Sequence, residues 1–399
     1  MKTIAVLFLL ILVKTCTVCA GHFSDSDLPV SIRGYVKAMP GVRFDNSFSK
    51  ADINNTFHNR INLRWDIAPG LNLRLEGRNR LIYNDMFIDL EPGFFDLLPG
   101  IDDVKDFYTQ DDGLVNMSWV WLSGEGWIGH TEIDRFFLDW SHESWRIRVG
   151  RQRINWGINL VSNPNDLFNT YSFFDVDYPE RPGADAVRVQ HYLSGMSNLE
   201  LAVSPARNSR DMVAAARFVH NWRAYDLQLV TGYYKNRLAL GGGWAGHIGG
   251  AGFKGEATWF HDLEKQEGIT RGTVVAAAGL DYMFPQGTFV ILEALYNGGH
   301  ERLGQFAFSI NEPLSPDNIM FSKYAITLSA DRAFSPLFSG GLAMMALPDI
   351  EAAFIMPNIS YSLLTNLDLE CVAQFFAGGK NTIFEEAGYG LFAVVKYSF

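Results

Sequence analysis

The residues of this chain that are best suited to bind a ligand are arginines that recur at every second position. In 57–84 and again in 143–194, arginine and other polar residues alternate with leucine, isoleucine and valine. Because successive side chains of a strand point to opposite faces, the polar set would share one face. This set is the candidate pore lining: Arg60, Arg64, Arg74, Glu76, Arg78, Arg80, Arg146, Arg148, Arg188 and Gln190.

Two interpretations of these arginines stand side by side. Arginine stays charged and presents a planar fork that fits a carboxylate or a phosphate, and basic side chains favour anions in pores. The same arginines could instead pair with Asp66, Asp134, Asp139 and Glu76 and hold the interior rigid. Both roles can apply at different heights of one structure.

A second candidate is the connector 154–183, which is too apolar for a freely solvated loop. Its asparagines favour turns, its prolines stiffen the chain, and its aromatic residues need burial. Folding inward would satisfy all three and would narrow a passage, whereas packing over a rim or against another subunit is the alternative. The residues expected in this constriction loop are Trp156, Asn165, Asp166, Phe168, Phe174, Glu180 and Arg181.

Motifs of enzymes are missing from the sequence. We find no phosphate-binding loop, dinucleotide fingerprint, zinc-protease motif or serine-hydrolase elbow. The histidines are scattered, so we expect no catalytic residue, no metal and no cofactor. The glycines between 241 and 252 indicate a close approach of strands. The acidic connector 85–129 suits Ca²⁺ or, with more support, a solvated loop facing lipopolysaccharide, with a short helix over 115–122.

The elements that must position these residues are strands. The last twelve residues alternate apolar with polar or small side chains and end on Phe399, and a strand with one continuous apolar face needs an apolar solvent. The whole chain divides into alternating segments of roughly 9 to 11 residues, the first of them 30–38 and 57–68. Beyond the N-terminus no apolar run approaches the 18 or more residues that a membrane helix needs. We count about eighteen strands, or sixteen if one weak hairpin merges.

The connections between these strands alternate in length. Every second connection is a tight turn, and most of the others are long; the expected turns are 69–70, 142, 195–196, 223, 248–249, 285–286, 333–336 and 365–366. Aromatic residues collect at strand ends, as they do at the two surfaces of a membrane. The expected girdle comprises Trp65, Trp140, Trp145, Trp222, Tyr83, Tyr296, Tyr397 and Phe399.

An aromatic-rich last strand that ends in phenylalanine resembles the outer-membrane β-barrel proteins of Gram-negative bacteria. The resemblance implies an all-β, transmembrane, antiparallel up-and-down barrel with short periplasmic turns and long extracellular loops. It also implies that the C-terminal strand is the signal read by the barrel-assembly machinery. The segment GRQRINWG (150–157) is similar to porin-like families near the alginate-export type.

The N-terminus has the three regions of a secretory signal peptide, with cleavage expected after Ala20. A lipoprotein signal is the less favoured alternative, because the residues around Cys16 and Cys19 fit it poorly. Removing 1–20 takes away two lysines and no acid, which changes the formal charge from −11 to −13. Residues 21–399 would then form one barrel domain with a single cysteine, Cys371, so no disulfide within the chain is expected.

These features predict a porin with a polar interior that passes small hydrophilic, anionic solutes through an arginine-lined lumen narrowed by the connector 154–183. Its expected partners are outer-membrane lipid, lipopolysaccharide, the assembly machinery and the solutes, with no nucleic acid. A second copy of the chain would suit its apolar outer face as well as lipid does. The alternatives are an adhesin or structural barrel and a lipid hydrolase, for which Ser194 and His191 are candidates.

Overall fold

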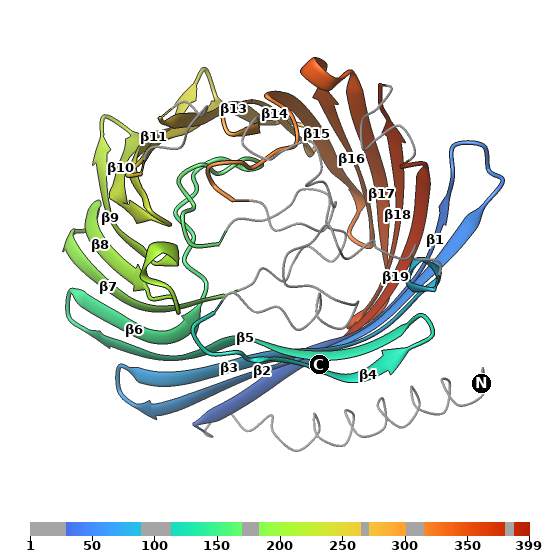
Figure 1. Cartoon of the computed structure of the whole chain (residues 1–399), viewed down its shortest axis with the longest axis horizontal. Coiled ribbons are helices and arrows are strands. Elements are labelled where there is room, and N and C mark those ends of the chain that lie inside the picture. Colours follow the sequence, from blue (N-terminus) through green and yellow to red (C-terminus); the bar gives the residue numbers. More distant parts are fainter. Residues whose placement is uncertain (1–28, 89–112, 170–182, 265–270, 301–314, 380–386) are drawn as a thin grey trace.

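The protein folds into one closed antiparallel sheet that surrounds an interior (Figure 1). A computed structural model describes residues 29–88, 113–169, 183–264, 271–300, 315–379 and 387–399. The expected signal peptide 1–20 lies outside the described residues. The all-β, antiparallel barrel that the alternating pattern predicted is confirmed.

Apart from β4, which pairs with β5 alone, each strand pairs with its neighbours along the chain; β3 pairs with β5, and the last strand pairs with the first. Phe399 lies just past the final strand and exchanges two backbone hydrogen bonds of 2.9 Å with Gly34, which closes the ring. The strands are β1 (Val30–Phe44), β2 (Ala51–Ala68), β3 (Leu71–Asn84), β4 (Ser118–Gly124), β5 (Trp127–His142), β6 (Trp145–Gln152), β7 (Ala184–Ser194), β8 (Ser197–Ser204), β9 (Val213–Trp222), β10 (Tyr225–Tyr234), β11 (Arg237–Ile248), β12 (Ala251–Asp262), β13 (Thr273–Met283), β14 (Thr288–Asn297), β15 (Tyr324–Ser335), β16 (Phe338–Leu347), β17 (Ala352–Leu364), β18 (Leu367–Ala377) and β19 (Tyr389–Ser398). Three short 3-10 turns complete the described elements: η1 (Asp85–Phe87), η3 (Ser209–Asp211) and η5 (Pro348–Ile350).

Strands β4 and β6 lie on the same side of β5, one beyond the end of the other, and together fill one place in the order of the wall. On that side of β5, β6 pairs with Phe136 to His142, and β4 pairs with Trp127 to Glu132 further along. Arg151 at the end of β6 donates to the carbonyl of Val115 at 2.6 Å, which ties the two segments together. The barrel therefore has eighteen wall positions, as expected, rather than sixteen. The helix expected over 115–122 is wrong, because its residues complete the wall that β6 leaves.

The expected tight turns lie at one end of the barrel, which we call the short-turn end. All of them occur within two residues of their predicted positions, for example at 69–70, 195–196 and 365–366. We call the opposite end the long-loop end. There the first hairpin corrects the expectation, because β1 and β2 extend to Phe44 and Ala51 and leave only 45–50 between them.

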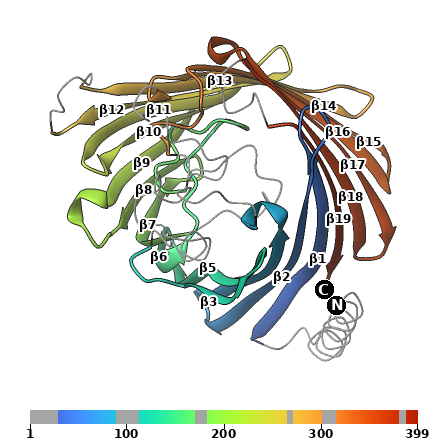
Figure 2. The same ribbon diagram turned by 45° about the vertical axis from the view of Figure 1, so that its right-hand side comes forward.

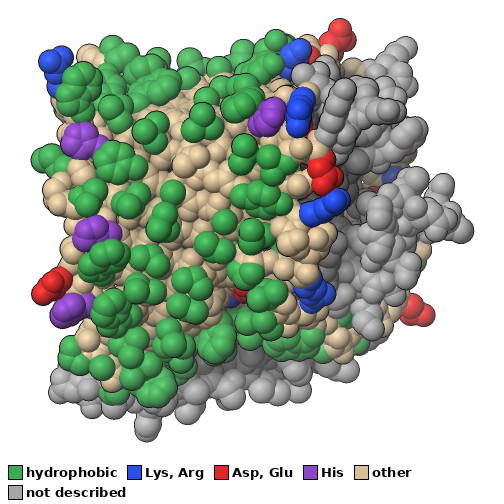
Figure 3. Space-filling view, turned by 60° about the vertical axis from the view of Figure 1, so that its left-hand side comes forward, with side chains coloured by type: hydrophobic (Ala, Val, Ile, Leu, Met, Phe, Trp, Pro, Cys, Tyr) green, Lys and Arg blue, Asp and Glu red, His purple; other side chains and the backbone are tan. Residues whose placement is uncertain are grey.

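The outer face of the wall is apolar. Large side chains that alternate with interior ones point outward, such as Leu229, which is 63% exposed, and Leu240, which is 56% exposed. One outer face is covered with apolar side chains, and its charged side chains gather toward the margins (Figure 3). Among the described residues, no helix is long and apolar enough to cross a membrane.

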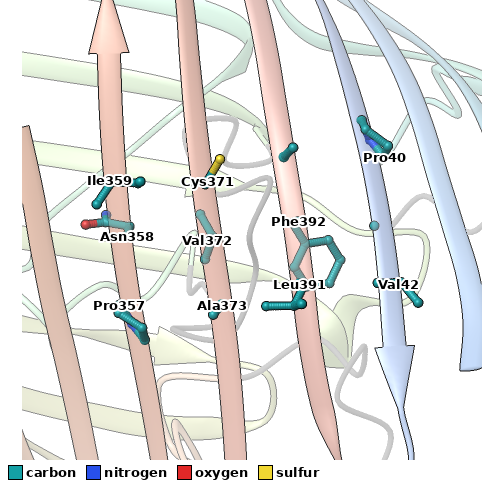
Figure 4. Close-up of a pocket in the computed structure, with 12 residues that line it drawn as sticks. Pro40, Val42, Pro357, Asn358, Ile359, Cys371, Val372, Ala373, Leu391 and Phe392 are labelled. Atoms are coloured by element: carbon teal, nitrogen blue, oxygen red, sulfur yellow. The ribbon is translucent and has the colours of Figure 1, made fainter. Parts of the chain in front are cut away.

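Two prolines interrupt the wall on either side of the hairpin β18–β19. Pro40 in β1 and Pro357 in β17 cannot donate to a ladder, and the pairing with β19 and β18 skips these residues and their neighbours. A shallow apolar hollow of about 660 Å³ lies at this level, with Cys371, Ala373 and Ala393 among its lining residues (Figure 4). The ladders on both sides of the last hairpin are thus each interrupted at a proline.

Candidate functional site

One segment of the chain lies inside the barrel. Residues 154–169, which we call the inner loop, continue from the end of β6 and run along the inner wall instead of closing a hairpin (Figures 1 and 2). The loop is compact, since the backbone N–H of Ile154 donates to Asn169 at 2.8 Å and the rings of Trp156 and Phe168 pack edge to face with centroids 5.1 Å apart. Of the residues expected in the constriction loop, Trp156, Asn165 and Asp166 are completely buried and Phe168 packs against the interior core. Phe174, Glu180 and Arg181 lie outside the described residues.

Carboxylates of the wall hold the inner loop through its backbone. Glu256 of β12 accepts a hydrogen bond from the N–H of Ile158 at 3.1 Å. Glu293 of β14 accepts from the N–H groups of Val161 and Ser162 at 3.1 and 2.6 Å. Hydrogen bonds from N–H groups to a carboxylate are roughly twice as strong as neutral ones. The loop is therefore anchored along its length by groups that belong to the barrel.

Trp156 anchors the start of the inner loop. Its indole N–H donates to the buried carboxylate of Glu200 on β8, and its carbonyl accepts from Gln228 of β10 at 2.7 Å. The same Glu200 accepts from Arg188 at 2.6 Å and pairs with Arg217 at 3.2 Å. One carboxylate thus connects the loop to two interior arginines.

Glycines of β11 provide the surface on which the inner loop rests. Asn165 donates to the carbonyl of Gly242 at 3.1 Å and accepts from the hydroxyl of Thr258 at 2.6 Å. A Cβ atom at Gly241 would collide with Asn165, and one at Gly243 would collide with Ile158. The close approach predicted from these glycines is confirmed, although the approaching segment is the inner loop and not a strand.

The interior is only partly polar, which corrects the expectation of a polar lumen. Apolar side chains from β7 to β18 form a core inside the barrel with Trp156 and Leu167 of the inner loop. The segment 315–322 joins this core through Ile319, Met320 and Phe321. Its backbone is held by Asn297, whose amide donates to the carbonyl of Met320 at 2.6 Å. The inner loop and the segment 315–322 therefore pack on the interior side of β8 to β14, and apolar side chains continue this core to β18.

The opposite side of the interior carries most of the predicted arginines, and a β-bulge organises them. Between Glu132 and Arg135 the register of β5 against β3 gains one residue, Asp134, and a bulge re-aims side chains. The carboxylate of Asp134 is completely buried, bonds to Arg60, and lies 3.1 Å from Nε of Arg78.

The arginines around this bulge share further carboxylates. Arg60 contacts Glu76 at 2.7 Å, Arg78 contacts Glu132 at 2.8 Å, and Arg80 lies 3.6 Å from Glu132. Here the ion-paired interpretation of the arginines describes the contacts.

The arginines of β6 and β7 are paired as well. Asp139 accepts from Arg146 at 2.5 Å and from Arg148 at 2.9 Å. Gln190 donates to Glu200 at 2.9 Å, beside Arg188. These carboxylates are fewer than the arginines that share them, so this part of the wall keeps a positive excess.

Arg64 and Arg74 differ from the other predicted arginines. Arg64 is half-exposed and pairs with the half-exposed Asp66 at 2.9 Å. Arg74 has no ion-pair partner among the described residues, and its buried Nε lacks a hydrogen-bond partner there. This arginine pair lies toward the short-turn end, near the turn 69–70.

The aromatic residues expected in the girdle lie at both ends of the strands. Trp65, Trp140, Trp145, Trp222, Tyr397 and Phe399 are at the short-turn end, and Tyr83 and Tyr296 are at the other. Trp222 is 55% exposed and points to the outside. At the long-loop end, hydrogen bonds from the N–H of Ile53 and the hydroxyl of Tyr83 hold the pKa of Asp85 below its usual range. A membrane-surface role for the aromatic residues of the girdle stays a prediction.

Sequence reasoning missed Glu200, Glu256 and Glu293, which hold the inner loop. Glu200 and Glu293 each stand among mostly apolar residues of their strands, at positions that face inward, whereas Glu256 lies between Lys254 and Thr258 on the inward face of β12. A buried lone carboxylate needs a partner, so this pattern could have pointed to a segment that donates to them. It also missed Arg151, whose pair with Asp185 at 2.8 Å lies where β4 meets β6.

Comparison of the sequence with protein-family models and with curated proteins finds no match. Among solved structures, the chain is similar to Pseudomonas aeruginosa OccK11 (OpdR), with 11% identity, a TM-score of 0.56, and 93% of this chain and 96% of that chain covered. It is similar to Acinetobacter baumannii OccAB2, with 9% identity, a TM-score of 0.55, and coverage of 92% and 98%. The outer membrane protein OpdK of Pseudomonas aeruginosa gives 10% identity, a TM-score of 0.52, and coverage of 92% and 98%. The chain has the fold of these proteins.

Proposed function

We propose that this protein is an outer-membrane channel through which small hydrophilic anions diffuse beside the inner loop. The short-turn end would face the periplasm and the long-loop end the exterior. The apolar outer face supports this placement, because a barrel closed by β1 and β19 satisfies its backbone without exposing a sheet edge to lipid.

The observation that carries the proposal is the unequal interior. The inner loop and the segment 315–322 pack against the wall from β8 to β14, while the predicted arginines lie on β2, β3, β6 and β7. Solutes would therefore pass along an arginine-rich wall on one side and the inner loop on the other. A wall whose arginines outnumber the carboxylates that they share attracts anions.

The pairing of the arginines is compatible with this function. Asp134 and Asp139 fix the guanidinium groups in place, and a fixed cation interacts with a passing anion without first paying for its own ordering. The two interpretations of the sequence thus apply at different heights. The bulge around Asp134 would be structural, and the wall toward the short-turn end would meet the solute.

A hydrolase receives little support from the described residues. The expected Ser194 and His191 share no hydrogen bond there, and the serine–histidine contacts are Ser118 with His130 and Ser197 with His220. Ser118 lies 2.7 Å from Nε2 of His130, but the other ring nitrogen, Nδ1, faces Arg80 at 3.5 Å. A catalytic histidine needs an acid at Nδ1 and a free acceptor at Nε2. A neighbouring guanidinium, which only donates, favours the opposite tautomer, so this pair would not activate its serine.

Swelling of liposomes that contain the purified protein tests the proposal. We expect gluconate to enter faster than glucose, and glucose faster than glucosamine, because the three solutes are similar in size and differ in charge. Protein-free liposomes serve as the control. Equal rates for the three solutes would refute the anion preference, and no entry at all would refute the channel.

A further inference from the structure

Three pairs of arginines face each other directly across neighbouring strands of the inner wall. They are Arg60 and Arg78, Arg148 and Arg188, and Arg64 and Arg74. Like charges at directly opposite positions destabilise a sheet. Each pair therefore calls for negative charge beside it.

The protein supplies that charge to the first two pairs. Asp134 contacts both Arg60 and Arg78. Asp139 accepts from Arg148 at 2.9 Å, and Glu200 accepts from Arg188 at 2.6 Å. In these pairs every arginine has a wall carboxylate of low exposure.

The third pair lacks this arrangement. Asp66 reaches Arg64 alone, and both side chains are about half exposed, at 51% and 47%. No described carboxylate contacts Arg74, although its Nε is buried without a hydrogen-bond partner. Its other neighbour across the strands is Phe137, whose ring lies 5.0 Å from the guanidinium of Arg148. Arginines thus lie on both sides of Arg74: Arg64 across β2, and Arg148, paired with Asp139, against the ring of Phe137 on β5.

We propose that Arg64 and Arg74 form a binding site for one anionic group of the passing solute, a carboxylate or a phosphate. The solute takes the place that wall carboxylates hold beside the other two pairs. The planar fork of arginine fits either group with two parallel hydrogen bonds. This inference rests on the proposed channel function and adds a discrete site near its short-turn end.

The test measures block of chloride current in planar bilayers by inorganic phosphate and, separately, by acetate, each added to one side at a time. We expect block of the wild-type protein to be stronger from the short-turn side. In Arg74→Gln the half-blocking concentration should rise about tenfold, as expected for the loss of one charged hydrogen bond. Arg74→Lys should restore part of the block, since lysine keeps the charge and loses the fork.

Two controls separate the site from general electrostatics. Arg332 lies near the short-turn end of β15 and alternates with the interior residue Asp331, so Arg332→Gln removes a cation from the outer face. Lys254→Gln removes an interior cation that is already paired with Asp281 at 2.5 Å. Neither change should alter the block.

The outcomes distinguish the site from the channel. An anion-selective wild type whose block is unchanged in Arg74→Gln would overturn the site and leave the channel standing. A wild type without anion preference would overturn the anion selectivity on which the site rests, and a wild type without any conductance would overturn the channel itself. As an independent readout, phosphate should raise the unfolding temperature of the wild type and not of Arg74→Gln; equal shifts would contradict the site.

Discussion

Replacing residues 155–167 by a short glycine–serine linker is expected to raise the single-channel conductance severalfold. This segment lies along the inner wall from β8 to β14 and makes contacts through Glu200, Glu256 and Glu293. The wall that supports it is formed by other strands, so the barrel should still assemble. Conductance in planar bilayers measures the effect, and heat-modifiable migration on gels checks folding.

Two valine substitutions on the wall are expected to lower the conductance instead. In Gly241→Val with Gly243→Val, new side chains occupy the space of Asn165 and Ile158, and the loop can yield only toward the open interior. We expect a lower conductance with more frequent closures. Gly242→Val is the matched control, because a Cβ there meets its nearest atom at an ordinary 3.4 Å. A conductance unaffected by both the linker and the double valine would show that the inner loop does not limit the passage.

Asp134→Ala is expected to destabilise the barrel by about 3 to 5 kcal/mol, because it removes the buried carboxylate that two buried arginines share and leaves each with one ion-pair partner fewer. Its carboxylate is the contact that Arg60 and Arg78 share in the bulge of β5, and both arginines are more than nine-tenths buried. Urea unfolding of the protein in detergent, followed by tryptophan fluorescence, measures the free energy of unfolding.

The control for this change is Asp66→Ala. Asp66 also pairs with an arginine, but both partners are half-exposed, and such pairs contribute about 1 kcal/mol or less. Similar losses in the two variants would mean that the bulge is not a structural centre. For the same reason, charge reversal at Arg78 would test folding before selectivity, and Arg74 is the residue to change when selectivity is measured.

The fold could be predicted because lipid imposes a simple rule on the sequence. A strand such as β3, with leucine at Leu71, Leu73 and Leu75 and charge between them, has only one orientation that keeps arginine out of hydrocarbon. The same rule places the tight turns, since each must fall where the alternation restarts. The same rule predicted that the last strand belongs to the barrel wall, and Phe399 at its end bonds to Gly34 of β1.

The ion pairs of the arginines with Asp66, Asp134, Asp139 and Glu76 could be named from the sequence, but which carboxylate meets which arginine could not, because that depends on pairings between distant strands. A single extra residue, Asp134, shifts the alternation of β5 and brings Asp134 to Arg60 and Arg78. Because such a bulge breaks the alternation of apolar and polar residues, periodicity alone indicates only a weak strand there. Likewise, the role of Glu293 depends on the hydrogen bond that it accepts from the N–H of Ser162, which lies 131 residues away in the sequence. Strand β4 was missed because it completes a position that another strand leaves.

The reversal potential of the purified protein in planar bilayers under a KCl gradient tests the central claim most directly. K⁺ and Cl⁻ have nearly equal mobility in water, so the sign of the potential reports the charge of the passage. We predict a potential that favours chloride and that shrinks when Arg64 and Arg74 are both changed to glutamine. A potential that favours potassium in the wild type would contradict the account.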